Sequence, residues 1–147
     1  MTLAYTSAAF ADKNIENGKT VNVSGITVTG TDSGNYTFNT TASATANITA
    51  KTLTIAAANQ SKTYGTTYTF DTTSPSADFT VTGLESGDAV NSITLTSIGA
   101  AATATVSGSP YLITPGAALG TGLDNYSISY TGGNFTITKA VLIVTAD

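Results

Sequence analysis

Polar and apolar residues alternate with a period of two along much of the chain. The clearest runs set a β-branched or aromatic residue against Thr, Ser or Asn, and they cover residues 20–24, 26–29, 91–96 and 134–138. This alternation predicts β-strands that bury one face and expose the other to water, as in antiparallel sheets. Thr suits the wet face, because its branched Cβ favours extended backbone while its hydroxyl stays solvated.

Turn signals separate these runs along the whole chain. They lie at Asn17-Gly18, residues 32–35, residues 85–88, residues 107–110 and Gly132-Gly133. The Ala-rich stretches at residues 56–58 and 100–102 are too short for helices. At most one short helix is expected, over residues 84–91, with Ser86 or Asp88 as its N-cap. The predicted fold class is therefore all-β.

A repeated pattern organises the chain. An Asn-Tyr pair ending at Tyr36 precedes a strand-like run through Lys51, and a second pair ending at Tyr126 precedes a similar run through Lys139. Each copy is expected to contain a turn, a Tyr strand, a hairpin and a long final strand. The final strand also opens the next unit, so residues 141–147 are expected to begin a unit that follows. The pattern indicates a slice of a tandem array of antiparallel β modules.

Composition excludes several classes of function. Among 147 residues there are five Lys, no Arg, nine acidic residues and no His, Cys or Trp, with a net charge of −4. Without His or Cys, the common zinc sites, a thiol nucleophile and a Ser–His–Asp triad cannot be built. Five scattered Lys in an acidic chain supply no basic patch for nucleic acid. The hydrophobic fraction of 41% argues against disorder. A non-enzymatic β protein without a cofactor is therefore expected.

The sequence also bears on the compartment. Residues 1–5 lack a basic region followed by an apolar core, so no signal peptide is expected. No run approaches 18 apolar residues, so no membrane insertion is expected. The lack of Cys fits either a reducing compartment or a surface protein exported unfolded through an outer-membrane pore.

Two groups of residues resemble repeat families of large bacterial surface adhesins of the filamentous-haemagglutinin type. Residues 10–49 resemble the second half of a YDG repeat, through Phe10-Ala11-Asp12-Lys13-Asn14, Gly18-Lys19, Val23-Ser24-Gly25, Gly34-Asn35-Tyr36 and Ala46-Asn47-Ile48-Thr49. Residues 51–139 resemble an MBG repeat of the YGX type. There the carrying residues are Lys51 to Ile55, Ser61-Lys62-Thr63-Tyr64-Gly65, Thr80-Val81-Thr82-Gly83-Leu84, Gly87-Asp88, Asn125-Tyr126 and Phe135-Thr136-Ile137-Thr138-Lys139-Ala140.

The resemblance implies an organisation and a role. The expected domains are a truncated YDG-like module at residues 1–50, which lacks the Tyr-Asp-Gly motif, and an MBG-like module at residues 51–147 that includes the first strand of a following repeat. Such repeats imply a rigid spacer in a secreted cell-surface adhesin, with neighbouring repeats as partners and a role in attachment or biofilm. The alternative is an adhesive module that binds host glycans or surface proteins. An Ig-like sandwich is favoured over a β-grasp-like sheet, which would need a packed helix.

Three tyrosines are candidate binding residues. Tyr36, Tyr64 and Tyr126 lie beside Asn or Gly at similar places in the units, where aromatic rings could stack on sugars. The competing interpretation is an anchor whose ring enters the core while its hydroxyl bonds a loop. Recurrence in repeat register favours the anchor, because repeat proteins repeat their core positions.

For the other candidate sites, a structural interpretation fits the sequence better than a functional one. Calcium needs six or more oxygens, and no loop holds more than two acids, so solvated turn residues are expected at Asp32, Glu85, Asp88 and Asp124. Lys51 and Lys139 suit edge protection better than an isopeptide crosslink. The Asn-x-Ser/Thr triplets are expected by chance in a Thr- and Asn-rich chain; they begin at Asn22, Asn35, Asn39, Asn47, Asn59, Asn125 and Asn134. The Thr-x-Thr runs at residues 27–29, 94–96 and 136–138 lack the flat ranks that ice-binding requires.

Overall fold

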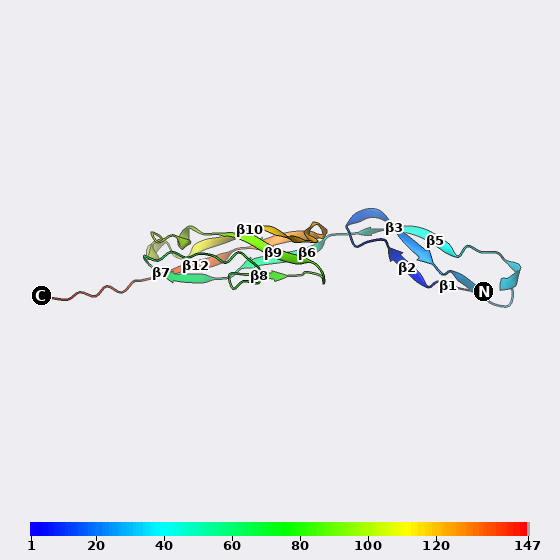
Figure 1. Ribbon diagram of the computed structural model, residues 1–147, viewed down its shortest axis with the longest axis horizontal. Helices are drawn as coiled ribbons and strands as arrows, with labels where there is room; N and C mark the ends of the chain where they lie inside the picture. Colours follow the sequence, from blue (N-terminus) through cyan, green and yellow to red (C-terminus); the bar gives the residue numbers. More distant parts are fainter. Residues whose placement is uncertain (147) are drawn as a thin grey trace. The chain divides into compact units, whose positions relative to one another are not determined.

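The computed structural model describes residues 1–146 (Figure 1). The chain divides into two compact units, Met1–Ala50 and Lys51–Asp147. Within the described residues the regular structure is β-strand, with four three-residue 3₁₀ turns as the helical structure. The all-β prediction is confirmed. Over the same residues, no helix has the length and apolar character needed to cross a membrane.

The first unit contains two small antiparallel sheets, ordered β2-β3-β5 and β1-β4. Its elements are β1 (Thr2–Ala4), β2 (Ser7–Phe10), β3 (Glu16–Ser24), β4 (Thr27–Thr29), the 3₁₀ turn η1 (Ser33–Asn35) and β5 (Thr41–Ile48). The Asn17-Gly18 pair is not the predicted turn between strands. It forms a bulge inside β3, because the pairing with β5 shifts register between Glu16 and Lys19 and Gly18 has φ +70°.

The second unit contains two larger sheets, ordered β7-β12-β10-β9 and β11-β6-β8. Its strands are β6 (Lys51–Ala57), β7 (Gln60–Thr63), β8 (Phe79–Thr82), β9 (Ala89–Thr96), β10 (Tyr111–Thr121), β11 (Tyr126–Thr131) and β12 (Gly133–Thr138). Its 3₁₀ turns are η2 (Ile98–Ala100), η3 (Val106–Gly108) and η4 (Leu123–Asn125).

Both sheets of the second unit share one hydrophobic core. Its buried members come from β6, β8, β9, β10 and β12 and from Ala104; they are Leu53, Ile55, Phe79, Val90, Ile93, Leu95, Ala104, Ile113, Phe135 and Ile137. The rings of Tyr68 and Phe70 pack edge-on against Phe135, with centroids 5.1 and 5.9 Å away. Two sheets around one core make a sandwich. Residues 1–146 hold no helix of the kind that a β-grasp would pack against its sheet.

The predicted alternation appears strand by strand in this unit. In β12, Phe135 and Ile137 are buried while Thr136 and Thr138 are exposed, and β9 alternates in the same way over residues 93–96. Fully burying such a side chain stabilises a fold by about 1.5–3 kcal/mol, whereas an exposed Thr contributes little. The many Thr side chains therefore lie on the outer faces of the sandwich.

The pairing of the first and last strands differs from the prediction. β6 pairs with β11 and β7 pairs with β12, both in parallel, so that Lys51 lies opposite Tyr126 and Thr63 opposite Thr138. The expected hairpin between the Tyr strand and the final strand is wrong. Instead the chain crosses from one sheet to the other at Gly133, where a Cβ would lie 2.8 Å from two carbonyl oxygens.

Residues 84–91, where the sequence allowed at most one short helix, form no helix. The segment is a turn followed by the start of β9 at Ala89. Gly87 has φ +89°, a left-handed conformation that interrupts a right-handed helix. The turn is closed by the Asp88 N–H, which donates to the Glu85 carbonyl at 3.1 Å.

The first unit has no comparable core. Lys19 is its buried residue, while Val21 and Val23, on the predicted inner face of β3, are only half-buried. Large apolar side chains of this unit are exposed, among them Tyr5 and Phe38. Small sheets without a covering layer leave their apolar faces in contact with water.

Candidate functional site

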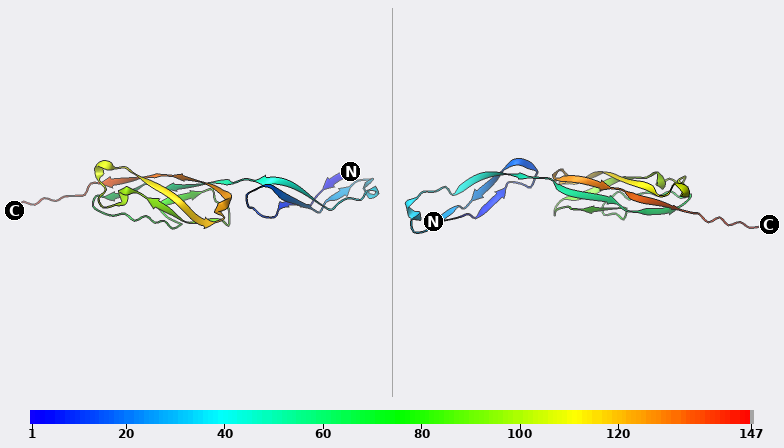
Figure 2. Two further views of the ribbon diagram at one scale, coloured as in Figure 1. Left: turned by 90° about the horizontal axis from the view of Figure 1, so that it is seen from above. Right: turned by 180° about the vertical axis from the view of Figure 1, so that it is seen from behind.

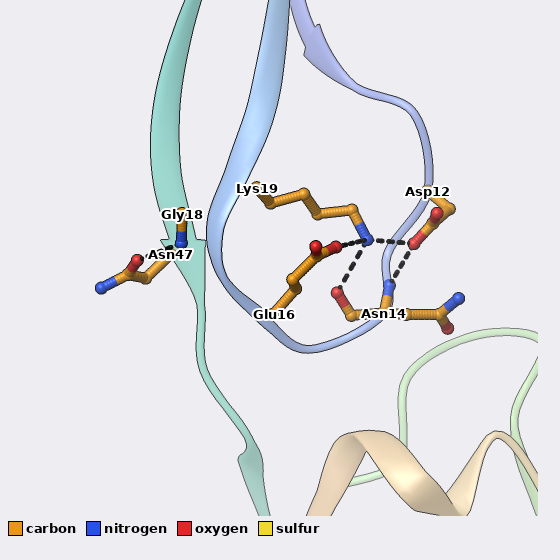
Figure 3. A network of polar contacts seen from close by, with 6 residues as sticks. All are labelled: Asp12, Asn14, Glu16, Gly18, Lys19 and Asn47. Carbon is orange, nitrogen blue, oxygen red and sulfur yellow. Dashed lines mark hydrogen bonds and ion pairs between the residues drawn. The ribbon is translucent and has the colours of Figure 1, made fainter.

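A buried lysine organises the first unit (Figure 3). The loop between β2 and β3 wraps around Lys19, whose Nζ contacts the Asp12 carboxylate and donates to the Asn14 carbonyl at 3.0 Å. The Glu16 carboxylate lies 3.6 Å from the same Nζ, and Asp12 also accepts the Asn14 N–H at 2.8 Å. Residues that carried the YDG resemblance therefore fix the shape of this loop.

Electrostatic interactions keep the Lys19 and Asp12 side chains ionised. The hydrogen bond from Lys19 lowers the pKa of the Asp12 carboxyl, and the hydrogen bond to Asp12 raises the pKa of Lys19 against the opposing effect of burial. The bulge at Gly18 re-aims the Lys19 side chain toward the loop, and the Gly18 N–H donates to Asn47 Oδ1 at 2.8 Å (Figure 3). Both Lys19 and Asp12 are therefore held by contacts that stabilise the loop between β2 and β3.

A second polar network lies inside the second unit, around Asp78. Its carboxylate accepts from Gln60 Nε2 at 2.6 Å, the Tyr68 hydroxyl at 2.6 Å and the Asp71 N–H at 2.7 Å. Burial, and then the hydrogen bond to Asp78, raise the pKa of Tyr68 to about 12. Three donors occupy the carboxylate, so the network anchors the loop between β7 and β8.

Lys62 is the other buried cation among residues 1–146. Its Nζ donates to the Thr66 carbonyl at 2.6 Å and the Ala101 carbonyl at 2.8 Å, which ties two loops together. Sequence reasoning missed the roles of Lys62 and Asp78. A signal existed for Lys62, because it lies on the inward side of the alternation in β7.

The three candidate tyrosines lie in different places. Tyr126 is the predicted anchor: it packs against the core, its hydroxyl accepts the Glu85 N–H at 2.9 Å and donates to Asp88 at 2.8 Å. Tyr36 and Tyr64 are 58% and 48% exposed, so the anchor interpretation is wrong for them. Tyr36 belongs to the first unit, and Tyr64 and Tyr126 belong to the second.

The candidate acids have structural partners in the second unit. Glu85 pairs with Lys51 and raises the pKa of that lysine, while Asp88 bonds Tyr126. Asp124 lies in η4. Over residues 1–146, the acidic side chains form no group of three or more that could hold a metal ion.

The candidate lysines, Asn-x-Ser/Thr positions and Thr-x-Thr runs lie at separate places in the structure. Lys51 forms an ion pair with Glu85, and Lys139 is exposed just after β12. Among the Asn-x-Ser/Thr positions, Asn47 and Asn59 use their side-chain oxygens to accept backbone N–H groups at 2.8 Å. The Thr-x-Thr runs of β9 and β12 are separated by β10 in the sheet order.

One shallow depression on the second unit is lined by apolar and hydroxyl side chains. Its lining residues are Thr96, Ser97, Ile98, Tyr111, Leu112 and Thr114. Ile98 and Leu112 are exposed, but the Tyr111 hydroxyl is occupied, since it donates to the Thr105 carbonyl and accepts the Thr105 N–H. The depression thus places the exposed Ile98 and Leu112 side chains beside Thr96, Ser97 and Thr114.

Comparison with known families agrees with this architecture. The chain matches the MBG domain (YGX type) over residues 53–136 and the YDG domain over residues 1–45. No curated protein and no solved structure matches it. Both domain types are repeat modules typical of large extracellular surface proteins, and neither is known as a catalytic family. The order of the two resemblances read from the sequence is confirmed. The chain belongs to the MBG domain (YGX type) family, with a YDG domain preceding its MBG domain.

Proposed function

We propose that this chain is a non-catalytic repeat module of a bacterial cell-surface adhesin, secreted to the surface, where it acts as a rigid spacer in attachment or biofilm formation. In this proposal residues 1–50 are a truncated module and residues 51–147 a module with the opening strand of the next. Its partners are the neighbouring repeats of the same polypeptide. The observation that carries the proposal is the parallel pairing of the first and last strands of the second unit.

Parallel pairing fixes where the chain enters and leaves that unit. The chain enters at Lys51, opposite Tyr126, and leaves after Thr138, opposite Thr63. Figures 1 and 2 show β6 starting at one end of the unit and β12 finishing at the other. At about 3.3 Å per residue, the run from Lys51 to Thr63 spans roughly 40 Å. A module of this kind adds length to an array without doubling back.

The same pairing supports resistance to load. A force applied at Lys51 and Thr138 pulls the paired strands past each other, so their hydrogen bonds are loaded together rather than one at a time. Each such bond contributes about 0.5–1.5 kcal/mol net, and two runs of them share the load. A spacer needs this property, whereas an enzyme or a lectin does not.

The buried charges support a non-catalytic role. Lys19, Lys62 and Asp78 are the buried charged residues of the described chain, and each is held by backbone or side-chain groups of a loop it stabilises. Catalytic acids and bases must instead reach a substrate.

The alternative function is a module that binds host glycans or surface proteins. The depression at Ile98, Tyr111 and Leu112 is the feature that favours it, because exposed apolar side chains surround a tyrosine there. Affinity at such a site would come from the exposed Ile98 and Leu112, since the Tyr111 hydroxyl is used internally.

The test is replacement within the surface protein that carries this chain. An unrelated β-sandwich of equal end-to-end length should preserve attachment, while deletion should reduce it by shortening the reach. Ile98→Ser and Leu112→Ser, at exposed positions, should leave attachment unchanged. Loss of attachment in the replacement and in both surface variants, with folding retained, would reject the spacer and support the binding module.

A further inference from the structure

The bulge of β3 contains the one Asn-Gly dipeptide of the sequence, Asn17-Gly18. Pairing with β5 stops at Glu16 opposite Ile48 and resumes at Lys19 opposite Ala46, so both residues of the dipeptide face Asn47 alone. Asn17 is exposed, and a Cβ on Gly18 would meet nothing within 4 Å. The dipeptide is therefore open to water and sterically unhindered at Gly18.

An exposed Asn-Gly dipeptide is chemically labile without an enzyme. The Gly18 nitrogen attacks Cγ of Asn17, and a new C–N bond closes a five-membered succinimide. The Cγ–Nδ2 bond breaks, and the amide nitrogen leaves as ammonia with the proton that Gly18 gives up. Water then adds to one of the two imide carbonyls and breaks its C–N bond, which leaves Asp or isoaspartate at position 17. Glycine favours the attack because no side chain hinders its nitrogen.

The fold restrains the attacking nitrogen. The Gly18 N–H donates to Asn47 Oδ1 at 2.8 Å, as Figure 3 shows. This bond keeps the proton on the nitrogen and points the N–H across the strand pair toward β5. The attack on Asn17 requires the same nitrogen to lose its proton and turn toward Cγ, so the hydrogen bond must break first.

We propose that Asn17 is a site of spontaneous deamidation in this chain, and that Asn47 slows the reaction by holding the Gly18 N–H. The inference is independent of the spacer role, because it concerns the chemical lifetime of the first unit rather than the work of the module.

Reaction at this site would disturb the network around Lys19. An Asp at position 17 would add a negative charge beside Glu16 in a chain whose net charge is already −4. Isoaspartate would add a methylene carbon to the backbone of β3, within the bulge that aims Lys19 toward Asp12. Because Lys19 is the buried residue of the first unit, the loop between β2 and β3 should loosen as the site reacts.

Peptide mapping of the full chain tests the proposal after incubation at mildly alkaline pH. Trypsin cleaves after Lys13 and Lys19, which isolates Asn17 in a six-residue peptide with Asn14 as an internal reference. A mass increase of about one dalton at Asn17, located by fragmentation, measures the rate. Asn47→Ala should raise this rate about two- to tenfold, as expected for the loss of one neutral hydrogen bond. In concentrated urea the two chains should react equally, since the sequence around Asn17 is unchanged.

Two further variants separate the hydrogen bond from general loosening of the strands. Asn47→Asp keeps an acceptor oxygen and should react within about twofold of the wild-type rate, or more slowly. Ala44→Gly weakens β5 opposite Val21 without touching the acceptor, and it should accelerate the reaction less than Asn47→Ala does.

Three results would overturn the role of Asn47. They are equal rates in the folded wild-type and Asn47→Ala chains, an Asn47→Asp chain as fast as Asn47→Ala, and an Ala44→Gly chain as fast as Asn47→Ala. An unreactive Asn17 in concentrated urea would overturn the deamidation site itself.

Discussion

Substituting Ile113 by alanine probes the register of β10, the strand that joins β9 and β12 in the larger sheet of the second unit. Ile113 is 0% exposed and lies in the shared core, whereas its neighbour Leu112 is 65% exposed on the opposite face. Truncating a fully buried Ile typically lowers the free energy of unfolding by about 2–5 kcal/mol, through lost burial and a residual cavity. Leu112→Ala, an exposed substitution of similar size, should change it by less than about 0.5 kcal/mol.

These free energies predict a large difference in melting temperature. For a unit of this size, each kcal/mol shifts the melting temperature by about 4–8 °C. Ile113→Ala should therefore melt roughly 8–40 °C lower than the wild-type chain, and Leu112→Ala within about 4 °C of it. Near-UV circular dichroism of the tyrosines follows the transition, since the chain has seven Tyr and no Trp. Urea unfolding at 25 °C gives the free energies directly.

The Leu112→Ala variant is the control that tests the register of β10. A slip of one residue in β10 would move every side chain of the strand to the other face. If Leu112→Ala costs as much as Ile113→Ala, or more, the register is wrong and so is the core assigned to the sandwich.

Three further predictions follow from the polar contacts. Tyr126→Phe removes a hydroxyl that bonds the turn before β9 and should lower the free energy of unfolding by about 1–3 kcal/mol in urea, whereas Tyr36→Phe, at an exposed ring, should not. Asp12 should titrate below its ordinary value of 3.8 by NMR, so the stability it contributes is present above that pH and lost as pH falls through the lowered pKa. Lys19→Met should move the Asp12 midpoint upward, and an unchanged midpoint would contradict the ion pair. With a pKa near 12, Tyr68 keeps its proton between pH 10 and about 12 while the unfolded chain releases it, so stability should fall with pH in that window. Tyr68→Phe should flatten that fall, and an equal slope in both proteins would argue against the raised pKa.

Local structure was predictable where one residue type marks one face. The alternation in β9 and β12 located both strands and their buried sides, because the hydroxyl of Thr favours the solvent face while Ile, Leu and Phe favour the core. Residues 84–91 form a turn rather than a helix because Gly87 adopts a left-handed conformation, which capping residues alone do not reveal. The Gly132-Gly133 pair fits a hairpin or a crossing equally well, since glycine permits both.

Pairing partners and burial could not be read from local pattern. Nothing within β6 specifies β11 as its neighbour, because parallel pairing is decided by packing of segments far apart in sequence. The same limit explains the tyrosines. Tyr36 and Tyr126 share a motif and a backbone conformation, yet Tyr126 is an anchor only because β6 and the turn before β9 lie beside it.

The central claim is that β11 and β12 run parallel to β6 and β7. A distance between two spin labels tests this claim most directly. Thr52→Cys and Thr138→Cys, both exposed, place labels where the chain enters and leaves the second unit. Parallel pairing of β6–β7 with β11–β12 predicts one narrow distribution centred at roughly 35 Å by double electron–electron resonance. A hairpin after β11 would return Thr138 to the entry end, and a distance under about 15 Å would contradict both the pairing and the spacer that depends on it.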